Sequence, residues 1–460
     1  MFVMYQIDFT NPIHIHFIGI GGISMSGLAS ILLDQHFIIS GSDAKESPLT
    51  KWMEDEGATV YYGQSSSNIK EGTDLVVYTA AIHPDNPEYA EAVRQGIPMM
   101  SRAELLGQLM RNYQTPIAVS GTHGKTTTTS MAAHVLLAAE KDPTISVGGI
   151  LKAIHGNIRV GGHETFLTEA CEYTNSFLHF YPKISMILNI DADHLDFFKD
   201  LDDIRHSFRL FAERLPEDGT LIINREIDHY QEITDGLPCR IITYGKGGDY
   251  CAENITYNST GYGAFDLVKS GITIGHFQLS VPGAHNVSNA LATLALADHL
   301  NIPVEAMQKG LLDFSGTDRR FEKKGEIGGV TIIDDYAHHP TEIRATLNAA
   351  RNYPHKTVWC VFQPHTYTRT KALMDEFADA LCLADKVILA DIYAARETDN
   401  LGISSRDLME KIQAKGGDVC YFPSFDAIEN YLLENCIHGD LLITMGAGDV
   451  VKIGESLLGR

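Results

Sequence analysis

The stretch 116–140, PIAVSGTHGKTTTTSMAAHVLLAAE, decides the fold of the chain around it. PIAVSG is an apolar run typical of a buried strand, THGKT is a glycine-containing turn, and the rest has apolar residues at the i, i+3 and i+4 spacing of a helix. A strand, a turn of this kind and a helix, in this order, are the context of a phosphate-binding loop. The sequence therefore predicts an α/β domain with a nucleotide site where this strand ends.

The loop departs from the usual G-x-x-x-x-G-K-[ST] spacing, because Val119 stands where the first glycine would fall. This implies a tighter loop, whose backbone N–H groups can still point at phosphate oxygens at the helix N-terminus. A threonine-rich helix cap is the alternative, and the strand–loop–helix context disfavours it. The lysine would bridge the β- and γ-phosphates of ATP, and the threonine after it would bind Mg²⁺. The predicted ATP loop is Gly121, Thr122, His123, Gly124, Lys125, Thr126 and Thr127.

Two further strand ends carry candidate metal ligands. FLTEACE ends at Glu172, and MILNIDADH ends with Asp191, Asp193 and His194. Because the carboxyl ends of parallel strands lie along one edge of a sheet, we expect these side chains near the phosphate loop. Mg²⁺ prefers oxygen ligands, which favours Glu172. Taken alone, a loop histidine such as His194 is more often a hydrogen-bonding group than a ligand.

Composition narrows the class of protein. A chain of 460 residues is too long for one core and predicts two to four domains. The 36 Lys and Arg against 59 Asp and Glu give a net charge of −23, which argues against a nucleic-acid or membrane partner. The seven scattered cysteines form no C-x-x-C pair, and we see no leader peptide and no apolar run of about 18 residues. These features predict a cytoplasmic protein.

Strands alternate with helices along the whole chain, which predicts mostly parallel sheets. We expect an α/β protein of three domains, at 1–112, 113–315 and 316–460. The first and third domains are expected to be Rossmann-like. The central domain is expected to be of the P-loop ATPase type.

The first domain opens with a glycine turn, Gly19 to Gly22, which can seat a diphosphate before a helix, and Asp43 ends its second strand. The same pattern suits a nicotinamide-dependent oxidoreductase. However, Ser24 stands where G-x-G-x-x-G has its third glycine, and such an enzyme has no use for the ATP loop. A non-catalytic nucleotide-dependent switch is a third interpretation, but it would not need Glu172, His194 and a histidine pair together.

Further motifs follow GTHGKTT in a fixed order: EACEYTNSFL, NIDADHLDFF, GAHNVSNALA, DRRFE, DDYAHHPTE and QPHTYTRT. With them the chain resembles, over nearly its whole length, the Mur ligase family, the ATP-dependent amino-acid ligases of peptidoglycan precursor synthesis. The shortened phosphate loop is the family's own form. DYAHHPTE, QPHTYTRT and the opening GIGGISMSGLA resemble members that add L-alanine to UDP-N-acetylmuramate. A member that adds a preformed tripeptide typically opens with G-x-C-G-T instead.

The resemblance implies three small-molecule substrates, ATP, L-alanine and UDP-N-acetylmuramate, and two Mg²⁺ ions. Thr126 and Glu172 match positions that hold the first ion, and His194 matches a ligand of the second. For ATP, the resemblance adds His285, Asn286, Asn289, Arg320 for the γ-phosphate and Asp335 near the ribose. It implies a monomer or a dimer.

For the other substrates, the resemblance implies that His338, His339, His365 and Arg369 lie near the reacting carboxyl group and the incoming amino acid. The catalytic set is Lys125, His194, Arg320, His339 and Arg369. The first domain is expected to hold the UDP-sugar through Gly19, Gly21, Gly22, Ser42, Asp43, Thr79 and Ala80.

The chain departs from the family pattern at one position. Several members carry a carbamoylated lysine 14 or 15 residues after the histidine that matches His194. Phe208 and Arg209 stand there, and no lysine occurs between Lys199 and Lys246. We therefore expect no carbamate; either Arg209 supplies a fixed charge or another ligand serves.

Overall fold

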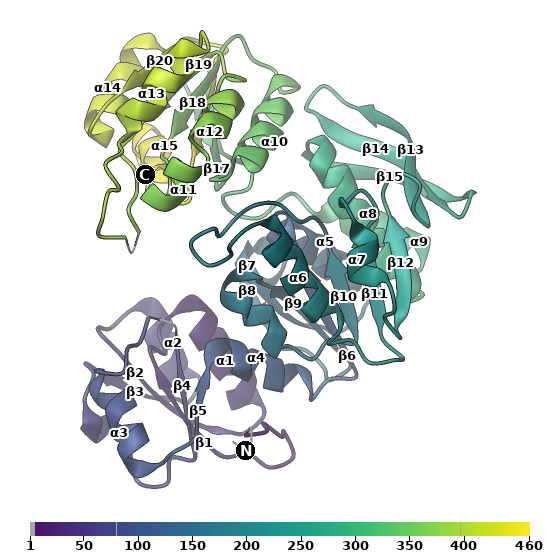
Figure 1. Cartoon of the computed structure of the whole chain (residues 1–460), viewed down its shortest axis with the longest axis vertical. Coiled ribbons are helices and arrows are strands. Elements are labelled where there is room, and N and C mark those ends of the chain that lie inside the picture. Colours follow the sequence, from purple (N-terminus) through teal and green to yellow (C-terminus); the bar gives the residue numbers. More distant parts are fainter. Residues whose placement is uncertain (1–4, 80, 396) are drawn as a thin grey trace.

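The computed structural model describes residues 5–79, 81–395 and 397–460. Three sheets follow one another along the chain, and each is the centre of a separate lobe (Figure 1). This confirms the α/β fold in three parts; the boundaries after 112 and 315 stay predictions. In the described part of the chain, no helix has the length and apolar character needed to cross a membrane.

The first lobe holds a parallel five-stranded sheet in the order β3-β2-β1-β4-β5, the order of a Rossmann-like half. The strand HIHFIGI forms because its apolar side chains, including Phe17 and Ile18, are fully buried. The elements are β1 His14–Ile18, α1 Ile23–Asp34, β2 Ile38–Asp43, α2 Pro48–Asp55, β3 Thr59–Tyr62, η1 Ser66–Asn68, β4 Leu75–Tyr78, α3 Pro87–Gln95, β5 Met99–Ser101 and α4 Arg102–Met110.

The middle lobe holds ten strands in the order β15-β14-β13-β12-β11-β10-β6-β9-β7-β8. The strand before the phosphate loop, β6, lies between β10 and β9 and is parallel to both. The elements are β6 Thr115–Ser120, α5 Lys125–Ala138, β7 Thr144–Leu151, η2 Lys152–Ile154, β8 Gly156–Arg159, β9 Thr165–Ala170, η3 Tyr173–His179, β10 Ile184–Ile187, α6 Leu201–Ala212, β11 Thr220–Asn224, α7 Tyr230–Thr234, β12 Arg240–Tyr244, β13 Tyr250–Tyr257, β14 Tyr262–Lys269, β15 Ile272–Pro282, α8 Ala284–His299 and α9 Val304–Asp313.

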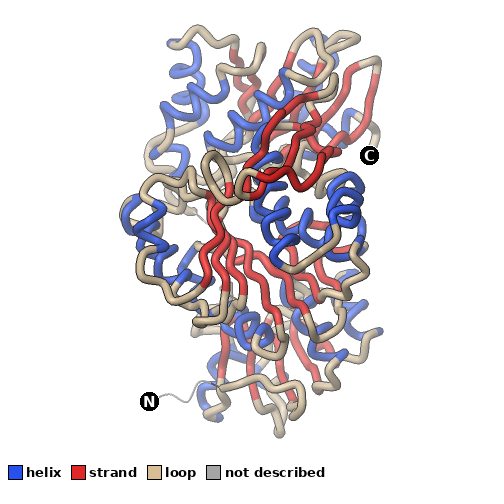
Figure 2. Tube along the Cα trace, turned by 90° about the vertical axis from the view of Figure 1, so that its right-hand side faces the viewer, coloured by secondary structure: helices blue, strands red, loops and turns tan. Residues whose placement is uncertain are grey.

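Both edges of this middle sheet are antiparallel, a feature that the alternating pattern did not predict. On one side β13, β14 and β15 form an antiparallel extension, and on the other β8 pairs antiparallel with β7. The strands appear side by side in Figure 2. Antiparallel strands therefore flank the parallel centre on both sides. The carboxyl ends of β10, β6 and β9 lie next to one another in the middle of the strand order.

The third lobe holds six strands in the order β16-β17-β21-β18-β19-β20, parallel except for β16 at one edge. The elements are β16 Glu322–Ile327, β17 Val330–Asp335, α10 Pro340–Arg351, β18 Val358–Phe362, α11 Tyr367–Ala372, α12 Met374–Leu381, β19 Lys386–Leu389, α13 Ser405–Ala414, β20 Val419–Tyr421, α14 Phe425–Asn435, β21 Leu441–Met445 and α15 Val451–Leu457.

The first lobe packs closely on the middle lobe at two glycines. A Cβ atom at Gly27 of α1 would collide with the side chain of Ile158 in β8. A Cβ atom at Gly107 of α4 would collide with the backbone carbonyl oxygen of His179, at the end of η3. These glycines let the helices of one lobe approach the other more closely than any larger residue would allow.

We expect Gly107→Ala to destabilise the protein, although alanine is the better helix former by about 1 kcal/mol. The added methyl group meets backbone, which cannot rotate away, so the cost should be roughly 1–3 kcal/mol. Thermal unfolding measures it as a lower midpoint. Gln95→Ala, on the exposed end of α3, is the control and should change stability by less than about 0.5 kcal/mol. A midpoint for Gly107→Ala at or above that of the parent chain would contradict close packing here.

Candidate active site

The phosphate loop begins later than the usual motif. Val119, at the position of the missing glycine, is a fully buried strand residue paired with Met186 of β10. The turn therefore consists of residues 121–124 and opens and closes on glycines with positive φ, +145° at Gly121 and +81° at Gly124. A Cβ atom at Gly124 would lie 2.7 Å from Oδ1 of Asn289, so that position requires glycine.

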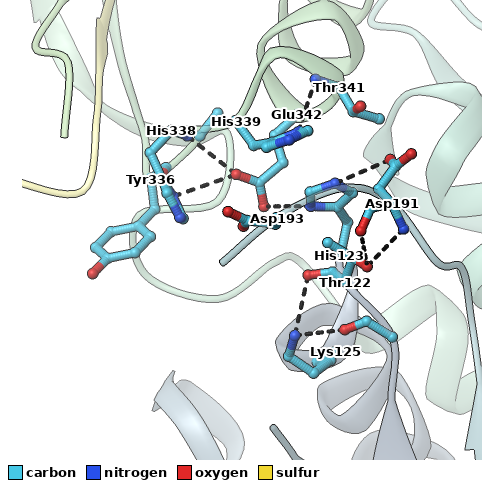
Figure 3. A network of polar contacts seen from close by, with 12 residues as sticks. Thr122, His123, Lys125, Asp191, Asp193, Tyr336, His338, His339, Thr341 and Glu342 are labelled. Atoms are coloured by element: carbon cyan, nitrogen blue, oxygen red, sulfur yellow. Dashed lines mark hydrogen bonds and ion pairs between the residues drawn. The ribbon is translucent and has the colours of Figure 1, made fainter. Parts of the chain in front are cut away.

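Lys125, the first residue of α5, lies across its own loop (Figure 3). Its Nζ donates to the carbonyl oxygen of Thr122 at 3.1 Å and to Oε2 of Glu172 at 2.9 Å. Burial lowers the pKa of Lys125, but the charge of Glu172 outweighs this effect and leaves the pKa raised. Lys125 is therefore a charged, buried cation, positioned by the strand end that carries Glu172.

Oxygen donors gather beside this ion pair. The hydroxyl of Thr126 donates to Oε2 of Glu169 at 3.1 Å, and Nε2 of His194 lies 3.7 Å from Oε1 of Glu172. Burial raises the pKa of Glu169. The three predicted metal ligands therefore lie beside two neighbouring acids, Thr126 at Glu169 and His194 at Glu172, and their binding of an ion stays a prediction. Sequence reasoning missed Glu169, although FLTEACE contains it three residues before Glu172.

A hydroxyl and two carboxylates are the donors that Mg²⁺ prefers, so this set fits the ion. The ammonium group of Lys125 already lies on Glu172 and shows that the carboxylate attracts a cation. The number of ions stays a prediction.

A first cavity of about 210 Å³ opens above the loop, between α8 of the middle lobe and β17 and α10 of the third. It brings together eight of the twelve residues predicted for ATP: His123, Gly124, Thr127, His285, Asn286, Asn289, Arg320 and Asp335. The other four form the loop beneath it. Their individual roles stay predictions.

The walls of this first cavity differ in charge. Burial lowers the pKa of His285 to about 4, so this imidazole is neutral. Burial raises the pKa of Asp335 to about 6, and its carboxylate accepts hydrogen bonds from the backbone N–H groups of Ala337 and Phe321. The guanidinium of Arg320 supplies positive charge at the cavity wall. An anionic ligand would therefore meet Arg320 on one side and the loop on the other.

Glu342, in the first turn of α10, joins the middle and third lobes (Figure 3). Its Oε1 lies 3.4 Å from Nδ1 of His123 in the phosphate loop and 3.6 Å from Nη1 of Arg320. Its Oε2 accepts the backbone N–H of His338 at 3.1 Å. Burial raises the pKa of Glu342, but the charges of His338, His123 and Arg320 hold it well below its usual value. DDYAHHPTE ends on this residue, and sequence reasoning assigned it no role.

His123 lies between two carboxylates. Its Nε2 is 3.2 Å from Oδ2 of Asp191, and its Nδ1 faces Glu342. Burial lowers the pKa of His123, but the close contacts with the carboxylates of Asp191 and Glu342 outweigh it and raise the pKa to about 9. The phosphate loop therefore carries a second buried cation besides Lys125.

A second cavity of about 300 Å³ is lined by His194, His338, His365 and Arg369. Three of them, His338, His365 and Arg369, belong to the set that the resemblance placed near the reacting carboxyl group, and that role stays a prediction. Nε of Arg369 donates to Oδ1 of Asp193 at 3.0 Å, which links the third lobe to the middle lobe. Burial raises the pKa of Asp193, but the charge of Arg369 outweighs it and lowers the pKa. This cavity is thus lined by a guanidinium and several imidazoles.

Other predicted residues lie elsewhere. His339 is not in the lining of either cavity; it caps α10 and places its Nε2 3.2 Å from the carbonyl oxygen of Ala192. Arg209 donates to the carbonyl oxygens of Ile233 and Asp235, so its side chain holds α6 to α7. Nothing in this placement supports a fixed charge from Arg209 beside the metal ligands.

The residues predicted for the UDP-sugar are in the first lobe and line neither cavity: Gly19, Gly21, Gly22, Ser42, Asp43 and Thr79. The backbone N–H of Gly21 donates to Oδ2 of Asp43 at 2.9 Å, so the glycine turn and the strand end do meet. The hydroxyl of Ser42 is buried and donates to Glu88. Ala80 lies outside the described residues.

Three family models match the chain in succession. Residues 14–114 match "Mur ligase family, catalytic domain", residues 119–297 match "Mur ligase middle domain", and residues 319–448 match "Mur ligase, glutamate ligase domain". The matches follow the three sheets in order.

Similar proteins span the full length of the chain. It is 62% identical to a UDP-N-acetylmuramate–L-alanine ligase of Agathobacter rectalis, over 99% of this chain and 100% of the relative, and 60% identical to one of Lachnospira eligens with the same coverage. Among solved structures, a UDP-N-acetylmuramate-alanine ligase of Thermotoga maritima has a TM-score of 0.80 at 29% identity, over 97% of this chain and 99% of the other.

The buried pairs of His123 predict how stability depends on pH. The folded pKa of about 9 lies above the ordinary value of 6.5, so the pairs contribute fully below about pH 6.5 and are lost as the pH rises through about 9. The contribution is at most about 3.5 kcal/mol, because the pKa rises from 6.5 to about 9 and each unit of pKa corresponds to about 1.4 kcal/mol. The difference in thermal stability between the parent chain and His123→Gln should shrink over this range.

Glu342→Gln is the companion variant. Because it removes one of the two carboxylates, the pKa of His123, followed by NMR titration, should fall toward its ordinary value. An imidazole of His123 that titrates near 6.5 in the parent chain would overturn this account.

Proposed function

The chain belongs to the Mur ligase family, and we propose that it joins L-alanine to the lactyl carboxylate of UDP-N-acetylmuramate, using ATP, in peptidoglycan precursor synthesis. The observation that carries the proposal is the full-length similarity, at 62% and 60% identity, to two ligases with this activity in their names. The two adjoining cavities support it, because a ligase must hold ATP beside the two groups it joins. The nicotinamide-dependent oxidoreductase finds no support among these relatives.

ATP is assigned to the first cavity. Its phosphates lie at the N-terminus of α5, where backbone N–H groups and the helix dipole favour negative charge. Lys125, which lies on the loop, and Arg320, at the cavity wall, would offset the repulsion between ATP and an incoming carboxylate. To reach the phosphates, Lys125 exchanges its contact with Glu172 for one with the nucleotide.

Thr126, Glu169, Glu172 and His194 are the residues that would hold Mg²⁺. The ion would neutralise charge on the phosphates during transfer of the γ-phosphoryl group. The carboxylate of Glu172 faces both groups. It would pair with Lys125 when the ion is absent and with the ion when it is bound.

The carboxylate is activated as an acyl phosphate, since a carboxylate ion is a poor electrophile. A carboxylate oxygen attacks the γ-phosphorus, the bond to ADP breaks, and the acyl phosphate forms. The alanine amine then attacks the carbonyl carbon, phosphate leaves and the amine loses a proton. The second cavity holds these groups: Arg369 provides positive charge, and burial lowers the pKa of His338 so that its neutral imidazole can accept a proton.

The first lobe, with its glycine turn and Asp43, would hold the UDP portion of the sugar nucleotide. We place the reaction in the cytoplasm, where ATP is available; the cysteines of the described residues are unpaired, as in a reducing compartment. A monomer or a dimer remains the expectation.

The test of the proposal is a phosphate-release assay with ATP and UDP-N-acetylmuramate, run against a panel of amino acids and against the preformed tripeptide. L-alanine should give the highest kcat/KM, and omission of the sugar nucleotide should abolish release. Activity with the tripeptide alone would keep the family but overturn the alanine assignment.

Lys125→Ala tests the phosphate loop. It removes a buried cation that faces the transferred phosphoryl group, so kcat should fall by at least about 100-fold. Binding of UDP-N-acetylmuramate, measured by calorimetry, should be retained because the first lobe is untouched. Release of ADP at the parent rate would contradict the role of this lysine.

A further inference from the structure

The wall between the two cavities contains a cluster that the proposed reaction does not use as a unit. His123, Asp191 and His339 each offer one ligand atom, and these atoms lie within 4.8 Å of one another. The first comes from the phosphate loop, the second from the loop after β10, and the third from the start of α10. The cluster therefore spans the middle and third lobes (Figure 3).

The side chains are oriented as metal ligands are. Glu342 faces Nδ1 of His123, so Nε2 points into the cluster. A carboxylate behind a ligating imidazole fixes its orientation and raises its basicity. Within the described residues, Nε2 of His123 is buried and makes no hydrogen bond, although Asp191 lies at ion-pair distance. A buried ring nitrogen without a hydrogen bond is unfavourable, so a ligand that binds this nitrogen would remove that cost.

The ring of His339 is held only by long contacts. Its Nε2 is 3.2 Å from the carbonyl oxygen of Ala192, and its Nδ1 accepts the backbone N–H of Thr341 at 3.3 Å. The two imidazoles lie with ring centres 4.8 Å apart. A tetrahedral ion with ligand bonds of about 2.1 Å needs its ligand atoms roughly 3.4 Å apart. His123 and Asp191 already have this spacing, at 3.2 Å between Nε2 and Oδ2, and the ligand atom of His339 lies within 4.8 Å of both.

Two imidazoles and one carboxylate select a borderline transition-metal ion over Mg²⁺, which prefers oxygen ligands alone. Three protein ligands leave a fourth position open to water. The donor set of this cluster is therefore distinct from the oxygen set at Thr126, Glu169 and Glu172.

We propose that His123, Asp191 and His339 form a binding site for a divalent transition-metal ion, Zn²⁺ above all, which clamps the phosphate loop to the third lobe. Binding displaces the proton on Nε2 of His123 to solvent. Because the ligands come from two lobes, the ion stabilises the arrangement of these lobes seen here by mass action. The phosphate-loop histidine and its facing carboxylates thus have a second use as a metal clamp.

The experiment is a Zn²⁺ titration of the full chain, stripped of metal, against a competing chromogenic chelator with Mg²⁺ in excess. The parent chain should bind one Zn²⁺ through this site. His339→Ala and Asp191→Asn should each weaken that binding at least about 10-fold. Loss of a residue that only hydrogen-bonds to a metal ligand already lowers metal affinity about 10- to 100-fold. His229→Ala, which removes an exposed histidine outside the cluster, is the control and should bind as the parent does.

Two further readouts keep the outcome decisive. Zn²⁺ should raise the thermal midpoint of the parent chain and of His229→Ala, but not that of His339→Ala. Because the chain has seven cysteines, Co²⁺ is used as a spectroscopic probe. The site should give ligand-field bands without thiolate-to-cobalt absorption. Equal affinity in all variants, or binding that appears only with the thiolate signature, would overturn the proposal. Asp191→Asn, nearly isosteric and partly exposed, guards against a failure of folding.

Discussion

The buried ion pair between Lys125 and Glu172 is the contact on which the rest of the site depends. Their side chains are 15% and 2% exposed, and a buried charge without its partner would cost several kcal/mol. The pair joins the start of α5 to the loop after β9, two segments that are adjacent only because β6 and β9 are parallel neighbours. Because these strands are parallel, the phosphate loop, its lysine and the carboxylates proposed as metal ligands lie at one edge of the sheet.

The third lobe completes the site through charged side chains that pair with oppositely charged groups of the middle lobe. Glu342 reaches into the middle lobe to meet the loop histidine, while Arg369 reaches to Asp193. Each contact places a charge of one lobe against a countercharge of the other, so separation of the lobes would expose both. In a chain with a net charge of −23, the cations Lys125, His123, Arg320 and Arg369 are concentrated where an anionic substrate has to bind.

Much of this arrangement could be predicted from the sequence. The phosphate loop and Glu172 follow from strand–loop–helix patterning and from strand ends, which are local signals, whereas the role expected of His194 came from the family resemblance. The antiparallel edges of the middle sheet could not be predicted, because alternation of strands and helices does not reveal which strands pair. Glu169 and Glu342 were missed for a similar reason: an acid in a strand or in the first turn of a helix resembles an ordinary surface residue until its neighbours are known.

The sequence by itself determined the family, the three α/β parts and the shortened phosphate loop, because these depend on residue types at fixed local spacing. Only the tertiary structure decided that Val119 is core, that Arg209 holds two helices together, and that His123, Asp191, His339 and Glu342 meet between two lobes. Those facts depend on burial and on distances between residues far apart in the chain. Charge pairing and pKa depend on such distances, and local patterns do not specify them.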